Sequence, residues 1–73
     1  MPKQLVMDHT GHSEHVFDKA DVVSFKEAEA RFMELTGKGF TAAVRAPDGR
    51  SDLVRTFDAD AEETLFIPRL QGG

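Results

Sequence analysis

The chain has 73 residues, no cysteine and a formal net charge of −4. This length predicts one domain with a small core, and the lack of cysteine excludes disulfides, a thiolate zinc site and a catalytic thiol. No apolar run reaches the roughly 18 residues of a membrane span, and Met1 to Gln4 are too polar for a signal peptide, so we expect a cytoplasmic protein. The basic residues form no stripe, which argues against nucleic-acid binding.

Residues 3 to 17 predict a β-hairpin. Leu5 to Met7 supply the first strand, His12 to Phe17 supply the second, and Thr10-Gly11 lies at the turn. A three-residue loop would place Leu5, Met7 and Phe17 on one face of the hairpin. A slip of one residue would reverse the faces.

A helix is predicted next, with Ser24 and Glu27 as a capping box and Phe25 as its first residue. One apolar stripe with a helical period follows, formed by Phe25, Ala28, Phe32 and Leu35. Gly37 is expected to cap the C-terminal end in a left-handed conformation, with Gly39 easing the exit.

Three further strands are predicted after the helix. The first covers residues 40 to 45, with Phe40, Ala42 and Val44 on one face, and residues 46 to 49 form a Pro-Asp-Gly turn. The second covers residues 53 to 57, and an acidic turn at residues 58 to 63, with Asp58 as a candidate cap, leads into the last, which begins at Leu65. The β-β-α-β-β-β order predicts an α+β fold with one helix packed on a mixed sheet.

This element order, followed by a Gly-Gly motif, resembles the ubiquitin-like β-grasp family. The stretch Thr64-Leu65 through Arg69-Leu70-Gln71-Gly72-Gly73 is similar to the T-L and R-L-R-G-G pattern of ubiquitin. It also resembles the F-P-P-V-A-G-G ending of the small subunit of molybdopterin synthase, a sulfur carrier, which Pro68 fits better. The segment from Asp8 to His12 resembles small prokaryotic ubiquitin-like proteins encoded beside activating enzymes and JAB-type peptidases.

The resemblance implies a β-grasp domain over residues 1–68 and a flexible tail over residues 69–73. It implies a protein modifier that is not an enzyme: an activating enzyme would adenylate the Gly73 carboxylate with ATP and magnesium, and a conjugating enzyme would pass it to amines. Arg69, Leu70 and Gln71 would be the recognition stem, and a JAB-type peptidase could reverse the reaction. No bound cofactor is expected. Glycines at positions 72 and 73 suit this chemistry because they lack a Cβ, so catalytic groups can approach the backbone closely.

Two other functions remain open from the sequence. One is a sulfur carrier with a thiocarboxylate at Gly73, and the other is a non-covalent β-grasp interaction module in which the glycines are incidental. Pro68, which has no N–H to donate to a strand partner, is expected to mark the point where the tail leaves the sheet.

A ubiquitin-like domain would also present an apolar patch on the open face of its sheet. Strand alternation places Leu65 and Ile67 in the core and makes Phe66 the candidate surface-patch residue. Aligning the Gly-Gly tails from their ends would instead place Ile67 on the patch, a difference of one residue.

A metal site is not expected. His9, His12 and His15 recur every three residues, but that spacing in a strand directs neighbouring members to opposite faces. The acidic stretch that begins at Asp58 lacks the glycine at position six and the glutamate at position twelve of a calcium loop.

Overall fold

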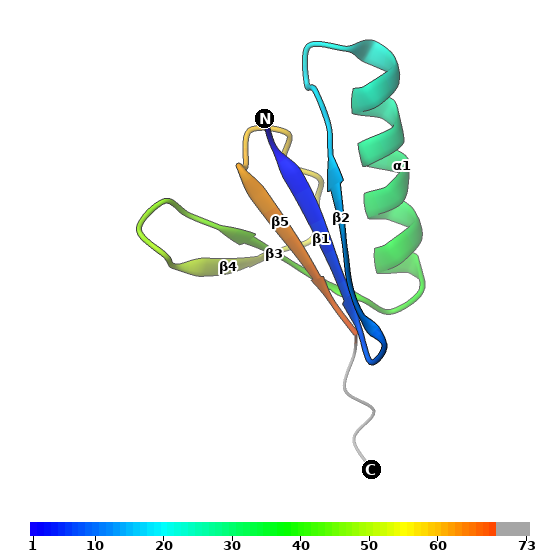
Figure 1. Cartoon of the computed structure of the whole chain (residues 1–73), viewed down its shortest axis with the longest axis vertical. Helices are drawn as coiled ribbons and strands as arrows, with labels where there is room; N and C mark the ends of the chain where they lie inside the picture. Colours follow the sequence, from blue (N-terminus) through cyan, green and yellow to red (C-terminus); the bar gives the residue numbers. More distant parts are fainter. Residues whose placement is uncertain (69–73) are drawn as a thin grey trace.

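The structure, a computed structural model, describes residues 1–68. Its described elements are β1 (Lys3–Asp8), β2 (Gly11–Val16), α1 (Val22–Gly37), β3 (Thr41–Arg45), β4 (Ser51–Val54) and β5 (Glu63–Ile67). The strands form one mixed sheet in the order β2-β1-β5-β3-β4, in which β1 and β5 are parallel and the other pairs are antiparallel (Figure 1). The predicted α+β class and element order are confirmed, and the topology is β-grasp-like.

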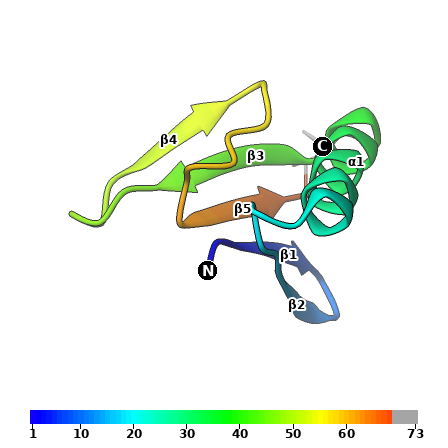
Figure 2. The ribbon, with the colours of Figure 1, turned by 90° about the horizontal axis from the view of Figure 1, so that it is seen from above.

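The helix lies against one face of the sheet and leaves the other face open (Figure 2). The core under the helix is built on Phe32, Ala42 and Phe66. The rings of Phe32 and Phe66 meet edge to face at 5.6 Å, a preferred geometry for aromatic pairs. Partly buried side chains complete this core: Val6, Leu35, Phe40, Val54 and Phe57.

The first hairpin turns more tightly than the sequence suggested. Asp8 pairs with Gly11, which leaves only His9 and Thr10 in the loop, and Gly11 supplies a φ of 134°. The expected grouping of Leu5, Met7 and Phe17 on one face is wrong. Phe17 is buried against the ring of Phe57 on the helix side, whereas Leu5 and Met7 lie on the open face.

The helix begins one turn earlier than predicted. Asp21 is the N-cap, and its carboxylate accepts a hydrogen bond from the Val23 N–H at 3.0 Å. The predicted Ser24–Glu27 capping box is wrong, because the Ser24 hydroxyl accepts from the Asp18 N–H in the preceding loop at 2.9 Å. The predicted stripe is confirmed: Ala28 and Phe32 are buried, and Phe25 and Leu35 are half-buried.

The C-terminal end of α1 lies two residues later than the sequence predicted. Gly37 is still helical and Lys38 is the C-cap, with its N–H directed to carbonyls of the last turn. Gly39, with φ of 101°, provides the left-handed residue that was expected at Gly37. The chain is then held against the helix end by the bond from the Phe40 N–H to the Leu35 carbonyl at 3.0 Å.

The remaining connections place β5 in the middle of the sheet. The turn at residues 46–49 is confirmed, with Gly49 at φ 92° and its N–H bonded to the Ala46 carbonyl at 2.9 Å. The predicted strand at residues 53–57 is displaced, because β4 covers Ser51–Val54 and Phe57 belongs to the following loop and core. In the acidic turn, Asp58 accepts from the Asp60 N–H at 2.9 Å, and the turn leads into β5 between β1 and β3.

Candidate functional site

The C-terminal strand and the open face of the sheet form the candidate site. β5 ends at Ile67, directly before Pro68, which agrees with the expectation that the chain leaves the sheet at this proline. The predicted conjugation residues Gly72 and Gly73, and the predicted stem Arg69, Leu70 and Gln71, lie outside the described residues. What the structure describes is therefore the surface from which this segment continues.

An apolar row crosses the open face. Leu5, Leu65, Ala43 and Leu53 stand in register on four neighbouring strands. Leu65 and Ala43 are buried even though no helix of residues 1–68 lies on this face, and Leu53 at the β4 edge is 76% exposed. Two residues further along their strands, Met7 and Ile67 extend the row toward the end of β5, at 38% and 42% exposure. We call Leu5, Met7, Leu53, Leu65 and Ile67 the open-face patch.

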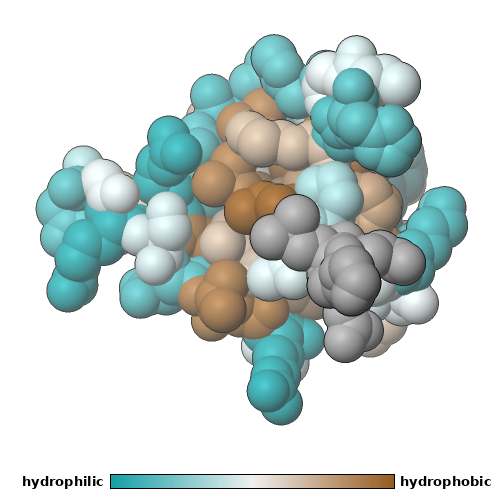
Figure 3. Space-filling model, turned by 90° about the horizontal axis from the view of Figure 1, so that it is seen from below, coloured by the Kyte–Doolittle hydropathy of each residue, from teal (hydrophilic) through white to brown (hydrophobic). Residues whose placement is uncertain are grey.

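Apolar side chains are also visible at the end of the molecule where β5 terminates. In the view from this end, brown and tan residues lie left of the centre of the molecule, and most of the teal residues lie toward its outline (Figure 3). An apolar centre within a polar rim is the usual anatomy of a protein-binding surface.

The assignment of Phe66 as the surface-patch residue is wrong. Phe66 is completely buried in the core under α1, in the row that pairs it with Val6 and Ala42. Ile67, the position given by aligning the Gly-Gly tails, is on the open face instead. Alternation alone does not tell the two faces of β5 apart, because this central strand lies between β1 and β3 and Thr64, Leu65 and Phe66 are all buried.

A charged row borders the apolar row on the side away from Ile67. The Lys3 ammonium lies 3.2 Å from Glu14 and 3.6 Å from Glu63, and Arg45 lies 3.5 Å from the other oxygen of Glu63. The hydrogen bond to Glu14 and the charges of Glu14 and Glu63 raise the pKa of Lys3. These pairs link four adjacent strands at the margin of the patch.

One oxygen in this row is imperfectly satisfied. Glu63 Oε1 is buried and makes no hydrogen bond within residues 1–68, and the Arg45 ion pair at 3.5 Å is its nearest charged contact. Its electrostatic partner is thus present, although the geometry is too long for a strong hydrogen bond.

The three histidines are distributed over the first hairpin. His9 lies in the two-residue loop, His12 is paired with Met7 in the open-face register, and His15 is paired with Gln4 in the register that faces the helix. Within residues 1–68 no three acidic or histidine side chains are grouped as metal ligands.

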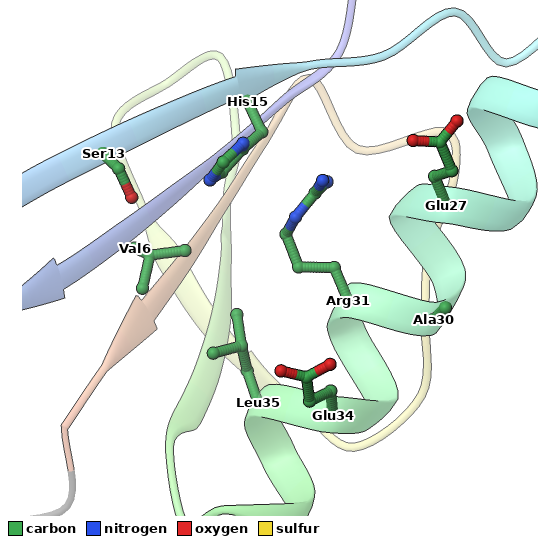
Figure 4. A pocket seen from close by; sticks show the side chains of 8 residues that line it. All are labelled: Val6, Ser13, His15, Glu27, Ala30, Arg31, Glu34 and Leu35. Carbon is green, nitrogen blue, oxygen red and sulfur yellow. The ribbon is translucent and has the colours of Figure 1, made fainter.

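A second polar feature, which sequence reasoning did not select, lies on the helix side. Gln4 is fully buried in β1; its amide donates to the Ala28 carbonyl at 3.0 Å and its oxygen accepts from Arg31 Nη1 at 2.9 Å. Arg31 extends from α1 toward β1 and β2 into a groove of about 410 Å³ (Figure 4). A glutamine at the start of an otherwise apolar strand, Leu5 to Met7, was the signal that could have drawn attention to it.

Across residues 1–68, no helix is both long and apolar enough to pass through a membrane. The fold and the open face define a small β-grasp-like α+β domain with one uncovered sheet surface. Comparison with known proteins gives no match: no family model, no curated protein and no solved structure matches the chain.

Proposed function

We propose that this chain is a ubiquitin-like protein modifier, joined to amines through the carboxylate of Gly73. The observation that carries the proposal is the position of β5: the central strand brings Ile67 to the open-face patch directly before the Pro68 to Gly73 segment. A partner bound to this patch would therefore lie beside the start of the segment that holds the reactive glycine.

The chemistry belongs to the partner enzymes and follows from the group transferred. A carboxylate oxygen of Gly73 attacks the α-phosphorus of ATP, and pyrophosphate leaves. A cysteine thiolate of the activating enzyme then attacks the acyl-adenylate and releases AMP. An amine attacks the thioester, loses a proton and forms an amide as the thiolate leaves. This chain supplies the carboxylate and a docking surface.

The experiment is an adduct assay in lysate of the source cells. The tagged chain, with Gly73 as its last residue, is incubated with ATP and magnesium and compared with a variant that lacks Gly73. We expect higher-mass species only with the complete tail. Trypsin cleaves after Arg69, so modified lysines should carry a Leu70-Gln71-Gly72-Gly73 remnant that mass spectrometry identifies. Adducts that form equally without Gly73 would rule out conjugation through this residue.

A sulfur carrier is the second candidate, and Pro68 is the observation that favours it. In that function a sulfur donor of the partner enzyme supplies sulfide-level sulfur that attacks the acyl-adenylate at Gly73. AMP leaves, and a thiocarboxylate remains in which sulfur replaces one oxygen. The intact mass of the chain isolated from native cells distinguishes the two functions, because a carrier would show the sulfur-for-oxygen increase without adducts. An unmodified mass and no adducts would leave a module that acts by non-covalent contact.

A further inference from the structure

We propose that the groove between α1 and β2 is a binding site for a carboxylate group, held by the guanidinium of Arg31. The groove is separated from the open-face patch by the sheet, since its lining residues Val6, Ser13 and His15 stand in the registers that face the helix. It requires nothing of the chain beyond residue 68.

Arg31 is held in place without being neutralised. A guanidinium has five N–H donors, and here Nη1 is bonded to the uncharged amide oxygen of Gln4 at 2.9 Å. Within residues 1–68 Arg31 forms no ion pair, although Glu27 and Glu34 lie one turn before and after it on the same helix. Gln4 itself is anchored to the Ala28 carbonyl, so the guanidinium is oriented by the buried core.

The groove around this cation combines hydrogen-bond donors with apolar walls. Ser13 and His15 on β2 line the groove opposite Arg31, and each can donate a hydrogen bond to an anionic oxygen (Figure 4). Its apolar walls are Val6, Ala30 and Leu35. Apolar walls displace water, which strengthens a charge-assisted hydrogen bond from a fork-shaped donor to a planar carboxylate.

The acidic residues of the groove limit the negative charge that a ligand can place at Arg31. Glu27 and Glu34 also line the groove, and within residues 1–68 only Glu34 has a cationic partner, Lys38 at 3.1 Å. A phosphate dianion would place two negative charges on one centre beside these carboxylates, whereas one end of a carboxylate ligand places a single charge at Arg31, which the guanidinium can match. The volume, about 410 Å³, suits a small dicarboxylate or one acidic side chain of a peptide.

The two sources of the carboxylate differ in what else they would contact. β2 has β1 as its only strand neighbour within residues 1–68, so its outer backbone groups are available to an extended peptide. A free dicarboxylate would perturb only the groove, and a peptide would also perturb the backbone amides along the outer side of β2.

The test is a titration of the ¹⁵N-labelled chain with three probes: succinate, inorganic phosphate and a blocked Val-Asp-Val peptide. We expect saturable amide shifts at Ser13, His15 and Arg31 with succinate or the peptide, at an affinity at least about tenfold above that of phosphate. The tighter of the two carboxylate probes identifies the source. Absence of saturable shifts with both, or equal affinity for phosphate, would overturn the proposal.

Variants assign the binding to the oriented guanidinium. Arg31→Gln should weaken binding about tenfold or more, and Arg31→Lys, which keeps the charge but loses the fork, should weaken it severalfold. Gln4→Leu tests positioning, because it leaves Arg31 in the sequence but removes its anchor. Arg55→Gln, an exposed arginine outside this groove, is the matched control and should bind as the parent does. Binding that persists in a folded Arg31→Gln or Arg31→Lys variant at parental affinity would contradict the assignment.

Discussion

Single side chains decide the tight turn of the first hairpin. Asp8 Oδ1 accepts hydrogen bonds from both the backbone N–H of Thr10, at 2.8 Å, and the Thr10 hydroxyl, at 2.6 Å. The hydroxyl bond is the main cause that lowers the pKa of Asp8 below its usual value, and the backbone bond from Thr10 adds to it. An aspartate that bonds its own turn in this way fixes a two-residue loop.

We predict that Thr10→Ala raises the pKa of Asp8 toward its ordinary value. Because the folded pKa of Asp8 is depressed, its contribution to stability is present above the unfolded pKa, about 4, and is lost as the pH falls through the folded pKa. The variant should therefore lose less stability on acidification than the parent. An NMR titration of the Asp8 carboxyl carbon measures the change. Ser13→Ala, which removes a hydroxyl from the same hairpin without touching Asp8, is the control.

At the scale of the elements, the start of α1 shows how a loop contact overrides a local motif. Both Asp21 and Ser24 are competent N-caps, and the sequence pattern favours Ser24 because Glu27 follows three residues later. In the fold the Ser24 hydroxyl accepts from the Asp18 N–H, which leaves Asp21 to cap the helix. This loop contact is not visible in the S-x-x-E motif itself.

Asp21→Ala is expected to lower the free energy of unfolding by about 1 kcal/mol, the usual cost of losing an N-cap. Glu27→Ala, which removes the acidic member of the predicted capping box, should change it by less than about 0.5 kcal/mol. Urea denaturation followed by circular dichroism measures both variants. A larger loss for Glu27→Ala than for Asp21→Ala would show that the helix begins at the later residue after all.

Stability measurements can also test which residues of β5 face the core and which lie on the open face. Phe66→Ala should cost about 3–5 kcal/mol because it empties the centre of the core. Ile67→Ala, on the half-exposed open face, should cost about 1 kcal/mol or less. Since a domain of this size has little stability to lose, Phe66→Leu provides a folded variant for the comparison. Equal losses at positions 66 and 67 would contradict the observed faces.

At the scale of the whole molecule, the open face is where a partner of the proposed modifier would dock. We predict that Ile67→Ser and Leu53→Ser leave the chain folded but reduce adduct formation severalfold in the lysate assay, because they interrupt the open-face patch. Met33→Ser is a matched control, since Met33 is a comparably exposed apolar residue on the helix side. If only Met33→Ser reduced adduct formation, the docking surface would lie on the helix and not on the open face.

Most of the architecture was predictable because it depends on local patterns. The helical stripe from Phe25 to Leu35 and the turn ending at Gly49 each carry a periodic or stereochemical signal that tertiary contacts did not change. The sequence did not predict which residues of the first hairpin and of β5 face the helix. In the hairpin, a loop one residue shorter than expected reverses the faces. In β5, three consecutive buried residues hide the difference between the two faces. The candidate site was only partly predictable: Ile67 emerged as an alternative, but the Gln4–Arg31 pair joins residues 27 positions apart.

The central position of β5 in the sheet also determines when the chain can finish folding during its synthesis. During synthesis the β1–β2 hairpin, α1 and the β3–β4 hairpin all emerge before β5, yet β1 and β3 have no contact in the sheet except through it. Each half is a local unit with little buried area, and joining them requires pairing between residues about 60 positions apart. The chain is therefore expected to close in one late step once β5 emerges, so that a truncated product lacking β5 would remain open and be recognised as unfolded by cellular quality control.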